Sequence, residues 1–296
     1  MPRRRFEGVI TRIIQATGYS TVLFVLMILF FLLREGLPAL AENKLSALFG
    51  TRWYPIESYY GIVPLILGSL VVTLGAILVA LPFGVGTAVY ISEIAPPIAK
   101  EILKPLIEIL AGLPSVVLGF LGILVLSPML RRLLNLPTGL TAFTGALLLG
   151  GIAIPTIVSV AEDALNTVPK SYREASLALG ATPWQTIWGV TVPAARSGIL
   201  TGVMLGVGRA MGETMTVMMV TGNAPVLPLS LQALFMPVRT MTATIASEMG
   251  EVAVGSSHYH VLFFIGLLLF LFSLAVNFAT SWFGYRRQKR SEQLLS

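Results

Sequence analysis

The chain has 296 residues, of which 55% are hydrophobic and 11% are charged, and its mean hydropathy is +0.83. Soluble domains carry roughly 25% charged residues, so the composition excludes an ordinary water-soluble domain and favours a protein that lies in the lipid bilayer. Because the sequence has no cysteine, disulfides, thiol catalysis and zinc fingers of the usual ligand set are excluded.

Six stretches with few or no charged residues are each long enough to cross a membrane as a helix, which takes about 20 residues. They cover 13–33, 58–92, 109–130, 133–161, 197–221 and 252–285, and only the fifth contains charges, Arg209 and Glu213. Lipid offers the backbone no hydrogen bonds, and these apolar runs do not alternate with polar residues as barrel strands do. The sequence therefore predicts an all-α polytopic membrane protein with six transmembrane helices.

An even number of crossings places both termini on the same side of the membrane. When that side is the cytoplasm, most basic residues that flank the spans lie inside, as the positive-inside rule requires, and Arg131 and Arg132 are the main exceptions. The first apolar run is longer than the core of a signal peptide and no small-residue cleavage site follows promptly, so we expect it to remain as the first span. The net charge of +6 belongs to these flanking residues and needs no nucleic-acid partner.

The spans suggest a division of the chain into three parts. We expect residues 1–60 to form the N-terminal tail, the first span and an external loop, 61–285 the transmembrane domain with a cytoplasmic loop at 162–195, and 286–296 a basic cytoplasmic tail. Pro96 and Pro97 should break any helix after the second span. The connection at 223–260 is too long for a turn, and its apolar patches predict helices at the outer surface, where a soluble partner could bind.

The cytoplasmic loop carries two sets of helix-start signals. Ser171 with Glu174 fits the capping pattern S-x-x-E, and Thr182 with Gln185 fits T-x-x-Q. Gly180 lies where the first helix should end, since glycine is the usual residue after a helix C-terminus. The loop therefore predicts two short helices that meet at Gly180 and form a compact projection.

The same loop resembles a known motif. In EASLALGATPWQTIWGVTVP, which covers 174–193, a Glu-Ala-small triplet is followed after three residues by glycine, and two aliphatic residues precede the final proline. This pattern resembles the EAA loop of type I ABC-importer permeases, in which the loop fits a cleft on the ATP-binding subunit; Ser176 replaces the usual second alanine. The resemblance implies that the ATPase is contacted by Glu174, Ala175, Ser176, Gly180 and Ala181.

The fifth span places charges inside the membrane. Gly202, Gly206, Arg209 and Glu213 follow 4, 3, 4 spacing, so a continuous helix carries them on one stripe. Small residues let a neighbouring helix approach closely. A charge near the bilayer centre costs about 2.5–3.5 kcal/mol, which makes both charged residues functional candidates. The structural alternative is an i,i+4 ion pair between Arg209 and Glu213 that neutralises itself.

The chemistry of this pair suggests an oxyanion. The Arg209 guanidinium can offer forked hydrogen bonds, whereas Glu213 repels a fully deprotonated anion but accepts a proton from hydrogen phosphate. The pair therefore suits phosphate better than sulfate. We assign Arg209, Glu213 and Thr214 to the expected substrate pathway, and Gly202 and Gly206 to helix packing.

Three longer runs resemble the phosphate-specific ABC permeases of the C type: GRAMGETMTVMMVTGN, SVAEDALNTVPKSYREASLALGAT and PVRTMTATIASEMGEVAVGSSHYH. The resemblance covers most of 61–283, and Asn223 with the Ser-His-Tyr segment favours the C type over the paired A type. It implies a MetI-like core in a prokaryotic cytoplasmic membrane, an A-type permease partner, two ATP-binding subunits and an extracytoplasmic phosphate-binding protein. ATP and Mg²⁺ are expected in the ATPase, with no catalytic residue, cofactor or metal in this chain.

Other functions agree less well with the sequence. No G-x-x-x-x-G-K-[ST] motif is present, so the chain shows no loop for ATP phosphates. An intramembrane serine protease is disfavoured because His258 and His260 precede the last span and no G-x-S-x-G motif occurs. We assign these histidines to surface structure rather than to a metal. An ion-coupled transporter would have no use for the EAA-like loop, whereas an A-type permease, or a permease for sulfate, molybdate or phosphonate, stays open.

Overall fold

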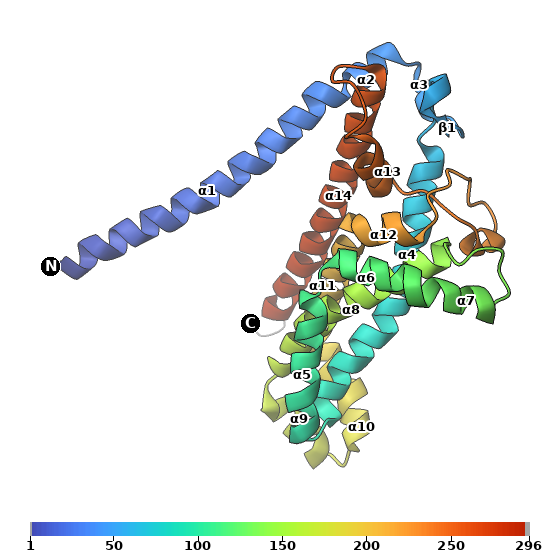
Figure 1. Ribbon diagram of the computed structural model, residues 1–296. Helices are drawn as coiled ribbons and strands as arrows, with labels where there is room; N and C mark the ends of the chain where they lie inside the picture. Colours follow the sequence, from blue (N-terminus) through green and yellow to red (C-terminus); the bar gives the residue numbers. More distant parts are fainter. Residues whose placement is uncertain (1, 294–296) are drawn as a thin grey trace.

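The computed structural model describes residues 2–293 and is almost entirely helical (Figure 1). Within residues 10–278, six helical segments are long and apolar enough to span a membrane: Ile10–Glu42, Val63–Ile94, Ser115–Leu133, Ala142–Asn166, Pro183–Gly212 and Ser257–Phe278. Each predicted stretch has one counterpart, so the six-span helical architecture is confirmed. Met1 and the last three residues of the predicted C-terminal tail, 294–296, lie outside the described residues.

The first helix extends away from the other helices. In Figure 1, α1 (Pro2–Gly36) approaches α14 (Ser257–Gln293) only near its C-terminal end. There a Cβ at Gly36 would lie 3.1 Å from the backbone of Phe263, and the Phe31 and Phe263 rings meet edge to face at 5.4 Å. From Ile10 to Phe30 the large apolar side chains of α1 are mostly exposed, as suits a helix that faces lipid or another subunit.

A short segment after α1 closes the same end of the molecule. It contains α2 (Pro38–Glu42), α3 (Leu45–Leu48), β1 (Trp53–Tyr54), η1 (Pro55–Glu57) and β2 (Tyr59–Tyr60). β1 and β2 pair antiparallel with Trp53 opposite Tyr60, and both rings are buried. They pack with Leu262 and Ile265 of α14 in one hydrophobic cluster, which fixes the hairpin against the bundle.

The centre of the bundle is formed by α4 (Val63–Val89), α8 (Ala142–Asn166) and α11 (Val192–Gly212). Glycines bring α4 and α8 into backbone contact: a Cβ at Gly75 would lie 2.8 Å from Ala146 Cβ, and one at Gly84 would lie 2.8 Å from Ile157 Cγ2. Close approach of this kind maximises van der Waals contact between membrane helices. We therefore treat α4 and α8 as one packed pair.

The third span is preceded by a separate helix. α4 continues into a π-helical turn, η2 (Tyr90–Ile94), and α5 (Pro97–Gly112) begins at Pro97 as the prolines predicted. The span then consists of α6 (Ser115–Leu121), η3 (Gly122–Leu126) and α7 (Ser127–Leu133). The uncharged stretch that begins at 109 thus contains the end of α5 as well as the span, because Leu113 and Pro114 are extended and proline disfavours a helical residue before it.

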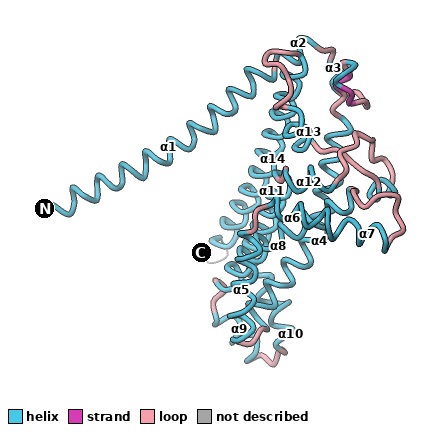
Figure 2. Tube along the Cα trace, in the orientation of Figure 1, coloured by secondary structure: helices cyan, strands magenta, loops and turns pink. Residues whose placement is uncertain are grey.

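The remaining short elements lie at one end of the bundle or between its middle and the other end (Figures 1 and 2). One end, called the α9 end below, carries α9 (Lys170–Ala178), α10 (Pro183–Thr186) and the π turn η4 (Ile187–Thr191). Towards the other, called the α13 end, are α12 (Met215–Val220), η5 (Leu231–Phe235) and α13 (Met241–Glu248). The long connection thus contains helices, as predicted. One side of α13 is buried through Met241, Ala243 and Thr244, and the loop before it packs closely on Gly68.

Candidate functional site

The α9 end projects as two short helices joined at a glycine. Gly180 has φ +87°, a left-handed conformation that ends α9, and α10 follows at Pro183. The predicted capping box at Thr182 is present: Gln185 N donates to Thr182 Oγ1 at 3.3 Å and Thr182 N donates to Gln185 Oε1 at 2.9 Å. The box predicted at Ser171 is wrong, because α9 already begins at Lys170 and Ser171 lies inside its first turn.

The projection exposes three of the five residues assigned to ATPase contact. Glu174, Ala175 and Gly180 are exposed, whereas Ser176 and Ala181 are half-buried. The Ser176 and Thr186 hydroxyls lie 2.9 Å apart, so Ser176 joins the two helices of the projection.

Two exposed apolar residues of the projection were not predicted from the sequence to be part of the docking surface. Leu179 is 90% exposed and Trp184 is 60% exposed, and they flank the turn at Gly180. Large apolar side chains at the tip of a polar loop are characteristic of a surface that another protein covers. Their positions on either side of Gly180 are the feature of the sequence that could have indicated this.

Beneath α9, polar side chains from several elements meet around a cavity of about 410 Å³, which is lined by Ser92, Glu93, Asn166, Val168, Lys170, Arg173 and Glu174. Beside it, Lys104 Nζ lies 2.6 Å from Glu162 Oε1. This hydrogen bond raises the pKa of Lys104 above its ordinary value, so the lysine is charged at neutral pH. The sequence did not indicate these contacts, because their partners are far apart along the chain.

The fifth span leads directly from the projection to the intramembrane charges. Pro183–Gly212 forms one span, after which Glu213 is extended with φ −70° and ψ 125°, and α12 begins at Met215. The continuous helix predicted through 213 is therefore wrong. Each interior glycine costs a helix about 1 kcal/mol, which weakens the end of α11 at Gly208 and Gly212.

The carboxylate of Glu213 stabilises the start of α12 instead of pairing with Arg209. Thr216 N donates to Glu213 Oε1 at 3.2 Å, and Thr214 Oγ1 donates to Gly212 O at 3.3 Å. Across the described residues there is no ion pair between Arg209 and Glu213. The self-neutralising pair considered above is thus not formed, because the break turns Glu213 off the helical stripe.

Arg209 is exposed and makes only long hydrogen bonds. Its Nη1 lies 3.4 Å from Thr156 Oγ1 and its Nη2 lies 3.3 Å from Ala111 O. Good N–H to O bonds measure about 2.7–3.2 Å, so both contacts are weak. The guanidinium therefore has donors that another oxygen-bearing group could take.

The glycine part of the stripe faces α8. A Cβ at Gly202 would lie 3.2 Å from Ile157 O, and one at Gly206 would lie 2.6 Å from Ile157 Cγ1. Both glycines are buried. Together with Arg209, which reaches Thr156 of the same helix, they place one side of α11 along α8.

At the α13 end, Glu248 connects three elements in what we call the Glu248 cluster. Arg239 Nη2 lies 2.6 Å from Glu248 Oε1, His258 Nε2 lies 2.8 Å from Oε2, and Trp53 Nε1 donates to Oε1 at 3.2 Å. All four side chains are mostly buried. The cluster fixes the β-hairpin, α13 and the start of α14 relative to one another.

The assignment of the histidines to the surface, ahead of the last span, is wrong: both lie in the first turn of α14, within the span Ser257–Phe278. The side chains of His258 and His260 are only 20% and 13% exposed, and His260 Nδ1 lies 2.8 Å from Glu35 O. His258 packs against the Trp53 and Tyr60 rings and bonds Glu248, whereas His260 contacts the end of α1, and no local pattern indicates these contacts. In the described part of the chain, no group of three or more His, Cys, Asp or Glu could hold a metal ion.

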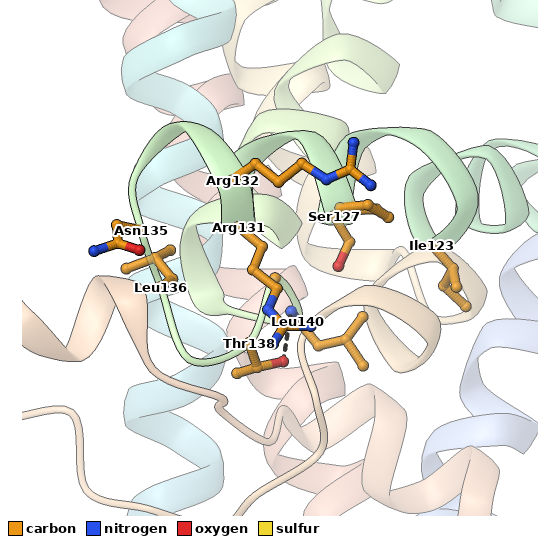
Figure 3. A pocket seen from close by; sticks show the side chains of 10 residues that line it. Ile123, Ser127, Arg131, Arg132, Asn135, Leu136, Thr138 and Leu140 are labelled. Carbon is orange, nitrogen blue, oxygen red and sulfur yellow. Dashed lines mark hydrogen bonds between the residues drawn. The ribbon is translucent and has the colours of Figure 1, made fainter.

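The two arginines that depart from the positive-inside pattern line a hollow at the end of α7. The cavity measures about 540 Å³ and also borders Ser127 and Thr138. In Figure 3, Arg131 extends towards Thr138 and Leu140, whereas Arg132 extends on the side of Ser127. Neither has an ion pair among the described residues, and both are exposed.

Comparisons with known sequences give consistent matches over most of the chain. Residues 80–289 match a family described as the binding-protein-dependent transport system inner membrane component. The probable ABC transporter permease protein YqgH of Bacillus subtilis is 40% identical over 278 residues, which cover 91% of this chain and 89% of the relative. The phosphate transport system permease protein PstC of Xylella fastidiosa is 33% identical over 260 residues, covering 81% and 79%.

A solved structure shares the fold at low sequence identity. In a bacterial alginate ABC transporter, crystallised in complex with an alginate pentasaccharide-bound periplasmic protein, one chain aligns with a TM-score of 0.64 at 15% identity. The alignment covers 94% of this chain and 95% of that one. It supports the predicted importer-permease core as a fold.

Proposed function

Because the chain belongs to the family of binding-protein-dependent transport system inner membrane components, we propose that it is a permease subunit that carries inorganic phosphate across the cytoplasmic membrane in an ATP-driven importer. The observation that carries this proposal is the single span Pro183–Gly212. It starts in the α9–α10 projection and ends at the interruption where Arg209 and Glu213 lie. One helical rod of about 45 Å thus joins the docking surface to the charged residues.

The projection is the docking surface for a separate ATP-binding subunit, which holds ATP and Mg²⁺. Its exposed Glu174, Ala175, Gly180, Leu179 and Trp184 offer both polar and apolar contacts. This chain has no phosphate-cradling loop and acts without a catalytic residue or cofactor of its own. Two ATPase copies and an A-type permease complete the membrane complex.

The α9 end faces the cytoplasm and the α13 end faces outward. With this orientation both termini are cytoplasmic and most flanking basic residues are inside. An extracytoplasmic phosphate-binding protein then docks at the α13 end. The alginate ABC transporter that shares this fold was crystallised with a periplasmic protein, which supports a partner of this kind.

The interruption between α11 and α12 supplies the phosphate contacts. Arg209 exchanges its long hydrogen bonds to Thr156 and Ala111 for the oxygens of phosphate, which a guanidinium binds well. The Glu213 carboxylate accepts the acidic hydrogen of hydrogen phosphate, which sulfate lacks at neutral pH, and Thr214 lies beside it. Closure and opening of the ATPase subunits move the rod and turn these groups from one side of the membrane to the other, so transport is inward.

Uptake into vesicles tests the proposal. Vesicles that hold both permeases and the ATPase should accumulate phosphate only when ATP and the binding protein are present. Uptake by this chain alone, or without ATP, would contradict it. Preferential uptake of sulfate, molybdate or phosphonate in the same vesicles would support the importer function but show that phosphate is not its substrate.

A further inference from the structure

α9 is held to the rest of the molecule mainly by polar contacts. None of its nine residues is buried, so removal of apolar surface from water does little to fix its position. Arg173 is its most firmly bound side chain: it is 22% exposed and donates to the Glu93 carboxylate and to the carbonyls of Leu165 and Val168. The position of α9 therefore depends strongly on this residue.

The Arg173 guanidinium joins α9 to η2 and to the end of α8. Its Nε donates to Glu93 Oε2 at 3.1 Å and its Nη2 to Oε1 at 2.5 Å. Nη1 donates to Val168 O at 2.7 Å, and Nη2 also reaches Leu165 O at 3.0 Å. A planar guanidinium can satisfy a carboxylate and neighbouring carbonyls together, which a lysine ammonium cannot do in the same geometry.

From Glu93 the polar contacts continue to α8 and α5. Glu93 is 9% exposed, and the Ser92 hydroxyl lies 3.1 Å from its Oε1 and 3.0 Å from Asn166 Oδ1. Asn166 Nδ2 donates to Glu162 Oε1 at 3.2 Å, and Lys104 Nζ lies 2.6 Å from the same oxygen. Charged and polar groups thus form an unbroken series from α9 through η2 and α8 to α5.

We infer that the Glu93–Arg173 ion pair is the rigid link through which the docking projection moves the α4–α8 pair. Residues 167–169 already join α9 to α8, whereas no nearby covalent connection joins α9 to the end of α4, because Glu93 and Arg173 are 80 positions apart. Since glycines hold α4 and α8 in close contact, a force applied at Glu93 moves both helices. Glu93 and Arg173 act here as positioning residues, through the helices that they join. The inference rests on the proposed ATP-driven import.

Two variants test the link in vesicles that hold the complete transporter. Glu93→Gln removes the negative charge, and Arg173→Lys keeps the positive charge but loses the forked hydrogen bonds of the guanidinium. Arg196→Gln is the control, because Arg196 is exposed, lies near the same end and has no ion pair among the described residues. We expect phosphate taken up per ATP hydrolysed to fall about fivefold or more in both variants. ATPase co-purification and ATP hydrolysis should persist, and the control should match wild type.

A distance measurement between α9 and α4 tests the link directly. The chain has no cysteine, so spin labels can be attached at Ser171→Cys on α9 and Leu78→Cys on α4, where both side chains are exposed. We expect the distance between the labels to stay constant between nucleotide-free and ATP-bound complexes of wild type. In the Glu93→Gln background it should change with nucleotide.

Three results would overturn the link: an unchanged uptake-to-ATP ratio in both variants, loss of ATPase co-purification in both, or a label distance that changes with nucleotide in wild type. The proposed function fails separately. If wild-type vesicles show no ATP-dependent uptake of any oxyanion, import is refuted, while a label distance that responds to nucleotide only in Glu93→Gln still supports the link.

Discussion

The Cβ position of Gly206 in α11 lies 2.6 Å from Cγ1 of Ile157 in α8, which is closer than two non-bonded carbon atoms approach in folded proteins. The same isoleucine lies 2.8 Å from the Cβ position of Gly84 in α4. Ile157 is therefore enclosed by two glycine surfaces, and the three central helices meet around one side chain.

We expect Gly206→Val to lower the stability of the bundle. The added carbon atoms overlap Ile157, and overpacking of this kind costs about 1–3 kcal/mol. The matched control is Gly208→Val on the same helix, because nothing lies within 4 Å of a Cβ at Gly208. Thermal unfolding in detergent measures both. Equal unfolding temperatures for the two variants would show that the contact with Ile157 does not limit packing.

The turn at Gly180 gives a prediction about docking. Gly180 has φ +87° and nothing within 4 Å of a Cβ, so a substitution acts through the backbone and not through a clash within the chain. A β-branched residue in this conformation costs about 1–2 kcal/mol, whereas asparagine tolerates it well. We expect Gly180→Val to reduce co-purification of the ATP-binding subunit and Gly180→Asn to retain it. If both variants lose the ATPase equally, the ATPase cleft excludes any side chain at 180 and the backbone is not the cause.

Glu213→Gln separates a role in transport from a role in assembly. The glutamine Oε1 can still accept the Thr216 N–H, and Arg209 loses no ion partner, so stability should change by less than about 0.5 kcal/mol. The variant cannot act as a proton acceptor, and we expect slower phosphate uptake or weaker discrimination against sulfate. Competition between the two anions in reconstituted vesicles provides the measurement. If the variant has the same phosphate uptake and the same selectivity as wild type, Glu213 is not part of the substrate pathway.

Glu248→Gln should loosen the α13 end. Arg239 would be left mostly buried without a charged partner, and removing one member of such a pair costs about 3 kcal/mol. Glu251→Gln is the control, since Glu251 is exposed and has no ion pair in the described residues. Limited proteolysis of the loop before α14 should become faster only in the first variant. Equal cleavage of both would show that the Glu248 cluster does not hold this loop.

Features that depend on nearby residues could be predicted from the sequence. The six spans follow from stretches of sufficient length with few or no charges, because apolar length decides whether a helix can cross lipid. Thr182, Gln185 and the left-handed Gly180 were predicted for a similar reason, since capping and backbone freedom act within one turn. The break at Glu213 shows the limit: helical spacing placed it on a stripe with Arg209, but two glycines and the cap of α12 interrupt the helix.

The sequence by itself determined that this protein crosses the membrane, where its helices run and which loop forms the projection. Only the tertiary structure decided how the charged groups are partnered: Glu93 pairs with Arg173, Glu248 pairs with Arg239 and bonds His258, and Glu213 accepts from a backbone amide instead of pairing with Arg209. The physical reason is range. Apolar length and caps depend on residues within a few positions, whereas an ion pair depends on which helices pack together, and that packing joins residues far apart in the chain.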